Sequence, residues 1–172
     1  MPPTAFQMAG EGIIADVNEF SDIDGTMARL RSMGAGRLQL DHLGVAVKSI
    51  AAARGFYEAL GLTVSHEETV ERERVKTAML PLGESRIELL EATEEDSVVG
   101  RFVATRGEGL HHVALRVGAV DTMFEKLRAQ GMRLASDSVQ VGAGGHLYFF
   151  VHPASTGGVL VEIVGDAVEE GK

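Results

Sequence analysis

The sequence predicts an α+β fold in which two tandem βαβββ modules share one sheet. An internal repeat is the first reason: residues 40–47 (LDHLGVAV) return as residues 110–117 (LHHVALRV), 70 positions later. Each copy also ends in an apolar run that contains one acid, residues 87–90 in the first and residues 160–164 in the second. Hydrophobic residues make up 45% of the 172 residues, which is enough to form a core.

Module one, residues 38–93, begins with the apolar run 40–47, whose β-branched residues predict a strand. Ser49 is typical of a helix N-cap, and apolar side chains recur at helical spacing over residues 50–60. Gly61 predicts the end of that helix, because glycine tolerates the left-handed conformation that follows many helices.

The rest of module one predicts three more strands. Residues 62–65 predict the start of the second strand, and the charged residues 66–73 predict a solvated loop or edge. Residues 75–82 and 86–91 predict a hairpin across the turn 83–85.

Residues 94–109 predict a linker with a short helix, which has acids in its first turn and glycines at its end. Module two, residues 110–165, then repeats the order of module one. Residues 110–117 predict a strand, and residues 120–130 predict a helix that stops at Gly131.

The end of module two predicts a broken strand over residues 133–135 and 139–141, followed by a flexible glycine loop over residues 142–145. Residues 147–151 and 159–164 predict the last hairpin.

Residues 1–37 share no pattern with either module. They predict an N-terminal arm that is partly helical or disordered, ahead of a domain over residues 38–172.

Composition limits the function. The net charge of −9 argues against nucleic acid as the main partner. No window approaches 18 uncharged apolar residues, so we expect no membrane span. Cysteine is absent, which excludes disulfides and thiolate ligands, and the N-terminus lacks the pattern of a secretory signal. We therefore expect a cytoplasmic protein in which any metal has nitrogen and oxygen ligands.

Four residues at matched positions form the candidate site. His42 and His112 are the third residues of the two repeats, while Glu88 and Glu162 lie between bulky apolar neighbours in the last strands. A single histidine in an apolar strand is usually a core residue, and a single glutamate on a strand usually faces solvent. Two of each, at matched places in two copies, instead predict a metal-ligand set between the modules.

Two imidazoles and two carboxylates suit a divalent ion such as Zn, Co, Ni, Mn or Fe(II). On an octahedral ion they leave two open positions, which can chelate two oxygens of one substrate if they are adjacent. The charge of the ion would stabilise an enolate or enediolate, and a glutamate that swings off the ion would act as the base.

At these residues the sequence resembles the vicinal oxygen chelate (glyoxalase/bleomycin resistance) superfamily and, within it, the methylmalonyl-CoA epimerases. The motifs that carry the resemblance are LDHLGVAV at 40–47, FYEALG at 56–61, LPLGESRIELL at 80–90, GEGLHHVA at 107–114, and HP at 152–153 before GGVLVE at 157–162. The first motif is specific only to the superfamily, whereas the last two are more like the epimerases.

The resemblance implies a cup-shaped, eight-stranded mixed sheet around one divalent metal ion, with His42, Glu88, His112 and Glu162 as ligands. It implies epimerisation of methylmalonyl-CoA at C2 through an enolate that the metal stabilises. One base would remove the α-proton and an opposed acid would return a proton to the other face, with Glu162 as one of these two groups. An acyl-CoA substrate and a homodimer are further expectations.

The chain departs from the family at one position. Some members carry a second glutamate on the third strand of the first module, where this sequence has Thr77. A threonine hydroxyl is too weak a base to replace a carboxylate, so the expected mirror of Glu162 is Glu88 or a bound water.

Three other functions fit the same pattern. A glyoxalase I-type lyase would use a comparable set of ligands and an enediolate. A ring-cleaving dioxygenase prefers two histidines and one carboxylate, so a fourth ligand argues against it. A metal-free small-molecule binding protein on the same fold would need no ligands, so metal content would distinguish it.

Overall fold

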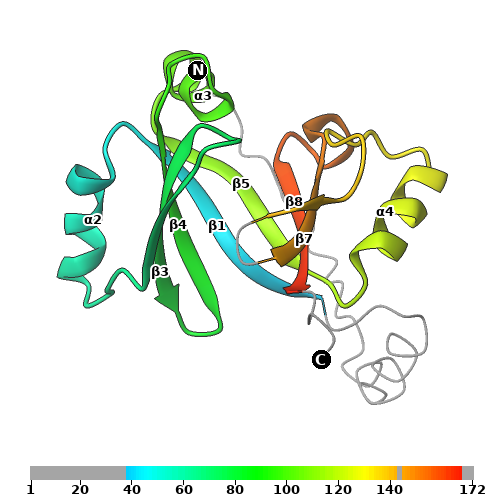
Figure 1. Ribbon diagram of the computed structural model, residues 1–172, viewed down its shortest axis with the longest axis horizontal. Coiled ribbons are helices and arrows are strands. Elements are labelled where there is room, and N and C mark those ends of the chain that lie inside the picture. Colours follow the sequence, from blue (N-terminus) through cyan, green and yellow to red (C-terminus); the bar gives the residue numbers. More distant parts are fainter. Residues whose placement is uncertain (1–37, 143–144, 168–172) are drawn as a thin grey trace, which may run out of the picture.

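The computed structural model describes residues 38–142 and 145–167, which form one curled, eight-stranded mixed sheet with three α-helices (Figure 1). The predicted fold class is thereby confirmed. The predicted arm over residues 1–37 lies outside the described residues, as do residues 143–144 of the predicted glycine loop. No helix in the described part of the chain is long and apolar enough to cross a membrane.

Module one follows the predicted order of elements. It comprises β1 (Gln39–Val47), α2 (Ile50–Ala59), β2 (His66–Val70), β3 (Val75–Leu82) and β4 (Ser85–Ala92). β1 pairs in parallel with β4, and β3 pairs antiparallel with both β4 and β2. The Ser49 hydroxyl caps α2 by accepting from the backbone N–H of Ala52 at 3.3 Å, and Gly61 follows the helix with a φ of 89°.

Module two repeats that order after the linker helix α3 (Val98–Arg106). It comprises β5 (Gly109–Arg116), α4 (Val120–Ala129), β6 (Gln140–Val141), β7 (His146–Val151) and β8 (Leu160–Ala167). β5 pairs in parallel with β8, and β7 pairs antiparallel with β8 and β6. The predicted broken strand is confirmed in part: β6 forms, whereas Leu134 makes only an isolated bridge to Val151.

An antiparallel pairing of β1 with β5 joins the modules at the centre of the sheet, in the strand order β2-β3-β4-β1-β5-β8-β7-β6. In Figure 1, β3 and β4 form one arm and β7 and β8 the other, with α2 and α4 on their outer sides. The inner faces of both arms line one pocket on the concave side of the sheet.

Strand alternation sends apolar side chains outward to the helices and the site residues inward. Two buried apolar clusters lie between helix and sheet: Val47, Ile50, Ala78, Leu80, Ile87 and Leu89 in module one, and Val117, Val120, Phe124, Phe149, Val151 and Ile163 in module two. Glu88 and Glu162 directly follow or precede members of these clusters along their strands. They therefore point to the concave side.

The second strand starts later than predicted. Residues 62–65 are not a strand. The charged segment His66–Val70 forms β2 at the edge of the sheet, so of the two expectations for residues 66–73 the edge is confirmed there. Leu62 and Val64 instead pack against the module-one core. An edge strand is bonded on one side only and its side chains reach water, so it tolerates a charged sequence that an apolar-run criterion rejects.

The acids of the linker do not lie in the first turn of α3, as the sequence predicted. Ser97 is the N-cap and accepts from the backbone N–H of Gly100 at 3.0 Å, so Glu94, Glu95 and Asp96 precede the helix. A serine directly before an apolar run offers the side-chain cap that the first free N–H groups need, and this outweighs the favourable placement of nearby acids.

Candidate active site

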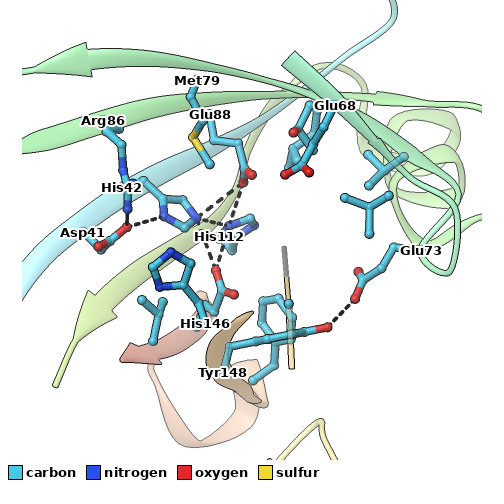
Figure 2. A pocket seen from close by; sticks show the side chains of 18 residues that line it. Asp41, His42, Glu68, Glu73, Met79, Arg86, Glu88, His112, His146 and Tyr148 are labelled. Atoms are coloured by element: carbon cyan, nitrogen blue, oxygen red, sulfur yellow. Dashed lines mark hydrogen bonds and ion pairs between the residues drawn. The ribbon is translucent and has the colours of Figure 1, made fainter. Parts of the chain in front are cut away.

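The pocket on the concave side of the sheet draws its lining from both modules (Figure 2). All four residues that the sequence singled out reach it: His42, Glu88, His112 and Glu162. Other polar residues on its walls are Asp41, Glu68, Glu73, Thr77, Arg86, His146 and Tyr148.

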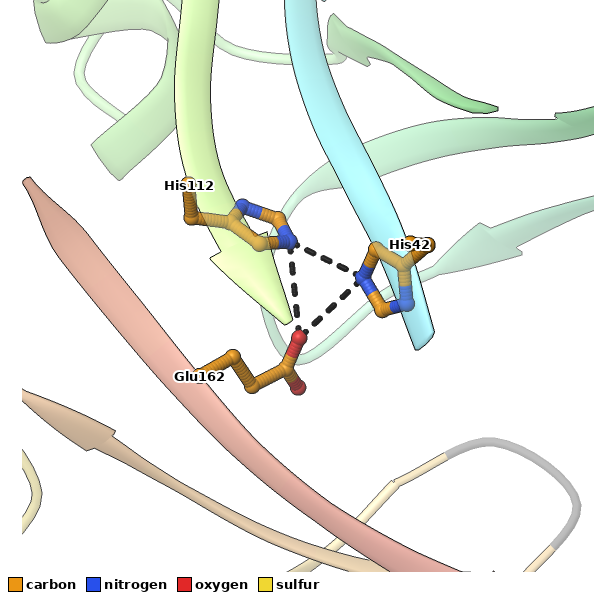
Figure 3. A group of neighbouring side chains, drawn as sticks. All are labelled: His42, His112 and Glu162. Atoms are coloured by element: carbon orange, nitrogen blue, oxygen red, sulfur yellow. Dashed lines mark hydrogen bonds and ion pairs between the residues drawn. The ribbon is translucent and has the colours of Figure 1, made fainter. Parts of the chain in front are cut away.

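The structure brings the four side chains together around the two imidazoles. The Nε2 atoms of His42 and His112 lie 3.0 Å apart. One oxygen of Glu162 lies 3.2 Å from Nε2 of His42 and 3.4 Å from Nε2 of His112 (Figure 3). One oxygen of Glu88 lies 3.4 and 3.5 Å from the same two nitrogens. All four are shielded from water, with side-chain exposures between 5% and 13%.

The register of the four central strands explains this convergence. Two rows of paired residues cross β4, β1, β5 and β8: Glu88, Gly44 and His112 in one row, and His42, Ala114 and Glu162 in the next. Each row thus carries one histidine and one glutamate with a small residue between them. Because neighbouring rows on one face are close, the four side chains meet.

Gly44 is glycine because the ring of His112 lies over it. A Cβ at this position would lie 2.2 Å from Cε1 of His112, far closer than real Cβ contacts. The equivalent residue of module two is Ala114, which carries a methyl group. The close approach of ring to backbone therefore occurs in module one only.

Sequence reasoning missed Asp41, which holds His42 in place. The Nδ1–H of His42 donates to the Asp41 carboxylate at 2.8 Å, and the guanidinium groups of Arg86 and Arg116 donate to the same buried carboxylate. Strict alternation would place Asp41 on the opposite face from His42, but an irregularity in the β1–β5 pairing between Leu40 and His42 breaks the alternation. The Asp-His dipeptide was the signal that could have found it, because a carboxylate often orients a ligating histidine.

His111 takes the equivalent position beside His112. The Nδ1 atoms of the two rings lie 3.0 Å apart, and the His111 ring stands edge-on to Phe102 of α3 with centroids 4.9 Å apart. Burial, followed by the charge of His112, lowers the pKa of His111 to about 4. His111 is therefore a neutral neighbour at pH 7, unlike the charged Asp41.

The charges of the cluster support one another. Burial lowers the pKa of His42, but hydrogen bonds with Asp41 and the two glutamates outweigh burial and raise it well above its ordinary value. Burial raises the pKa values of Glu88 and Glu162, but hydrogen bonds from the two imidazoles outweigh it and hold both below their ordinary range. The carboxylates therefore stay ionised at neutral pH, and protons on the imidazoles balance part of their charge.

The donor set fits a divalent cation. With its Nδ1–H bonded to Asp41, His42 turns its Nε2 toward His112. Within the described residues, donor atoms of His42, His112 and Glu162 all lie within 4.8 Å of one another. Lone pairs that face one point repel one another unless a cation or protons lie among them. Imidazole nitrogen and carboxylate oxygen are ligands that Zn, Co, Ni, Mn and Fe(II) accept.

The outer walls of the pocket differ between the modules. Thr77 of β3 and Tyr148 of β7 occupy equivalent register positions in the two arms. The buried Thr77 hydroxyl has no hydrogen-bond partner among the described residues. The Tyr148 hydroxyl donates to Glu73 at 2.5 Å, which joins the β2–β3 turn to β7. Burial and then this carboxylate raise the pKa of Tyr148.

Comparisons with known proteins identify the family that shares this architecture. A family model of the Glyoxalase/Bleomycin resistance protein/Dioxygenase superfamily matches residues 41–150. The chain is 40% identical over 126 residues to the uncharacterized protein YqjC of Bacillus subtilis, covering 73% of this chain and 90% of that protein. It is 32% identical over 127 residues to mitochondrial methylmalonyl-CoA epimerase of Bos taurus, covering 73% of each.

A solved structure of methylmalonyl-CoA epimerase in complex with methylmalonyl-CoA and NH4+ matches with a TM-score of 0.73 and 37% identity, covering 80% of this chain and 100% of that one. The resemblance that the sequence motifs predicted is confirmed. The chain belongs to the Glyoxalase/Bleomycin resistance protein/Dioxygenase superfamily and, within it, to the family of the methylmalonyl-CoA epimerases, which are isomerases.

Proposed function

We propose that this protein epimerises methylmalonyl-CoA at C2 and requires a divalent metal ion held by His42, Glu88, His112 and Glu162. The convergence of these four side chains in one pocket, two from each module, is the observation that carries the proposal. The related structures support the substrate class. One epimerase holds methylmalonyl-CoA, and the Streptomyces coelicolor enzyme holds 2-nitronate-propionyl-CoA.

The reaction moves one proton off C2 and one proton onto it. Glu162 is a shielded carboxylate that two imidazoles keep ionised, so it can accept the C2 proton as the C–H bond breaks. The electron pair of that bond passes into the thioester and forms an enolate. A proton delivered to the opposite face of C2 then gives the inverted product. When bound, the cation supplies positive charge that stabilises the negative charge developing on the substrate oxygens.

Asp41 takes part through His42. Its hydrogen bond fixes the tautomer and the orientation of the imidazole, and the two arginines fix Asp41 in turn. We also propose that the protein is cytoplasmic, that it forms a homodimer, and that its domain has the limits expected from the sequence. Light scattering on the purified protein measures the number of subunits.

The test is uptake of solvent deuterium at C2. Metal-loaded protein is incubated with methylmalonyl-CoA in D₂O and followed by NMR, beside an EDTA-treated sample and a Glu162→Gln variant. We expect exchange in the loaded protein and its loss in both controls. Metal-bound protein without exchange would contradict the epimerase proposal and favour another enolate-forming reaction, such as that of a glyoxalase I-type lyase. Exchange that survives EDTA would contradict the metal requirement.

A further inference from the structure

We propose that Glu68 is the second acid/base group, acting on the face of C2 opposite to Glu162; this inference rests on the proposed epimerase function. Inversion at one carbon needs a proton carrier on each face. The resemblance described above expects a second glutamate where this chain has Thr77, and a hydroxyl cannot replace a carboxylate as a base of comparable strength.

Glu88 is poorly placed to be that second carrier. Its carboxylate and that of Glu162 each lie within 3.5 Å of both imidazole Nε2 atoms, so both belong to the donor set. If both glutamates left the cation to move protons, only two imidazoles would hold it. A carboxylate from outside the donor set avoids this loss of ligands.

Glu68 is such a carboxylate, because its position in the β2–β3 pairing directs its side chain into the pocket. It is directly opposite Thr77 in the β2–β3 pairing, and directly opposed residues project from the same face of a sheet. Both residues line the pocket. Its neighbour Glu67 points the other way, toward α2, where it pairs with Arg54 at 3.0 Å. Figure 2 shows the Glu68 carboxylate on the same wall of the pocket as Glu88, across from Tyr148.

The hydroxyl of Thr77 is an independent sign that a ligand belongs at this place. Thr77 is 4% exposed, and its hydroxyl has no hydrogen-bond partner within the described structure. A buried hydroxyl without a partner costs free energy, which a substrate oxygen in the pocket would remove. The unpaired hydroxyl lies beside Glu68, so a substrate bound to Thr77 would be next to the proposed proton carrier.

The exposure of Glu68 also suits a proton carrier. Its side chain is 32% exposed, so its carboxyl group can exchange protons with water between turnovers. Its ion pair with His66, at 3.6 Å, is solvent-exposed and contributes little. Glu73, another acid on this side of the pocket, already accepts the hydrogen bond from Tyr148.

The test compares Glu68→Gln with Glu67→Gln, its neighbour on the other face of β2, in the full-length protein loaded with Co²⁺. Each enantiomer of methylmalonyl-CoA is incubated separately in D₂O, and inversion and exchange at C2 are both followed. We expect Glu68→Gln to lower the rate of inversion by about 100-fold or more, the usual contribution of one acid/base group, while Glu67→Gln matches the wild type. Glu68→Gln should still exchange C2 of one enantiomer, the one whose proton faces Glu162, without inverting it.

Two results would overturn the role of Glu68. Inversion by Glu68→Gln at the rate of Glu67→Gln would show that Glu68 carries no proton. Equal loss of exchange from both enantiomers would assign Glu68 to substrate binding or to folding, which the melting temperature and metal content of the same samples separate. If the wild type does not exchange C2, the proposed function is overturned as well. If the wild type inverts both enantiomers, the proposed function stands whatever the role of Glu68.

Discussion

Module one and module two bring the same two side chains to the pocket, a histidine from the first strand and a glutamate from the last, but they surround them differently. The equivalent neighbours are Asp41 and His111, Gly44 and Ala114, Thr77 and Tyr148, and Glu68 and Gln140. The proposed cation would lie between two related halves and take similar ligands from each. The proposed substrate, methylmalonyl-CoA, has no two-fold symmetry, so the walls around the ligands are free to differ.

The difference gives the pocket two unlike walls. Module one contributes acids, with Glu68 and Glu73 near the rim, whereas module two contributes the rings of His146, Tyr148 and Phe150. The outer part of the pocket therefore presents carboxylates on one side and aromatic rings on the other. The following predictions test how far the two modules are equivalent.

The largest expected difference separates the two glutamates. Glu162→Gln should lower epimerisation by about 1000-fold or more, because an amide cannot accept the C2 proton. Glu88→Gln should cost only about tenfold, because the amide oxygen still offers a ligand. The measurements are the turnover rate and the metal content of both variants. Equal losses in both would restore the symmetric role, with Glu88 as the mirror of Glu162, and would count against Glu68.

Gly44 should be less tolerant of substitution than a glycine away from the site. In Gly44→Ala the new methyl would meet the His112 ring, so we expect a loss of about 1–3 kcal/mol in the free energy of unfolding and weaker metal binding. Gly55→Ala in α2 is the control, because a Cβ there would meet nothing within 4 Å and alanine favours a helix by about 0.5–1 kcal/mol. Urea unfolding and metal titration compare the two. Similar stability of both variants would contradict the ring-over-backbone contact.

The partners of the two histidines should differ in importance. Asp41→Asn should weaken metal binding by about 10- to 100-fold, because it removes the charge that orients His42 and pairs with two arginines. His111→Gln should have a smaller effect, because His111 is a neutral neighbour. Competition with a chelator gives both affinities. A larger effect of His111→Gln would reverse the ranking of the two modules.

The smallest effects are expected at the matched pair Thr77 and Tyr148. Tyr148→Phe should lower the free energy of unfolding by about 1 kcal/mol, because the hydrogen bond to Glu73 is lost. Thr77→Val should raise it by up to about 1 kcal/mol, because it removes a buried hydroxyl without a partner. Denaturant unfolding measures both changes, and changes of the same sign would contradict the contrast between the two arms.

Tyr148 also gives a dependence on pH. Burial and then Glu73 raise the pKa of Tyr148 above its ordinary value of 10.0, so the folded protein keeps a proton that the unfolded chain releases. Stability from this group is fully present below pH 10.0 and falls as the pH rises through the raised pKa of the folded protein, because the unfolded chain has by then lost its proton. Tyr148→Phe should therefore differ from the wild type in the slope of stability against pH above about pH 10. Parallel slopes in urea titrations would contradict this.

The order of the elements was predictable from the chain because nearby residues indicated the helices and all of the strands except β2. The internal repeat was more informative about the site than any single position. His42 alone is typical of a core histidine, but its match to His112, together with the match of Glu88 to Glu162, predicted that four side chains meet. The pairing of β1 with β5 and the curl of the sheet brought them together as expected.

Other features of the structure could not be predicted from local sequence patterns. Alternation assigns Asp41 to the wrong face, because the irregularity in β1 depends on pairing with β5, whose residues lie about 70 positions away. Local pattern left residues 66–73 as either a loop or an edge, and pairing with β3 decides that His66–Val70 is an edge strand. The contact between Glu73 and Tyr148, 75 positions apart, depends on how far the sheet curls. Local sequence determines which side chains alternate on a regular strand, whereas register, irregularity and curl arise from pairing between distant strands and decide which of those side chains share a pocket.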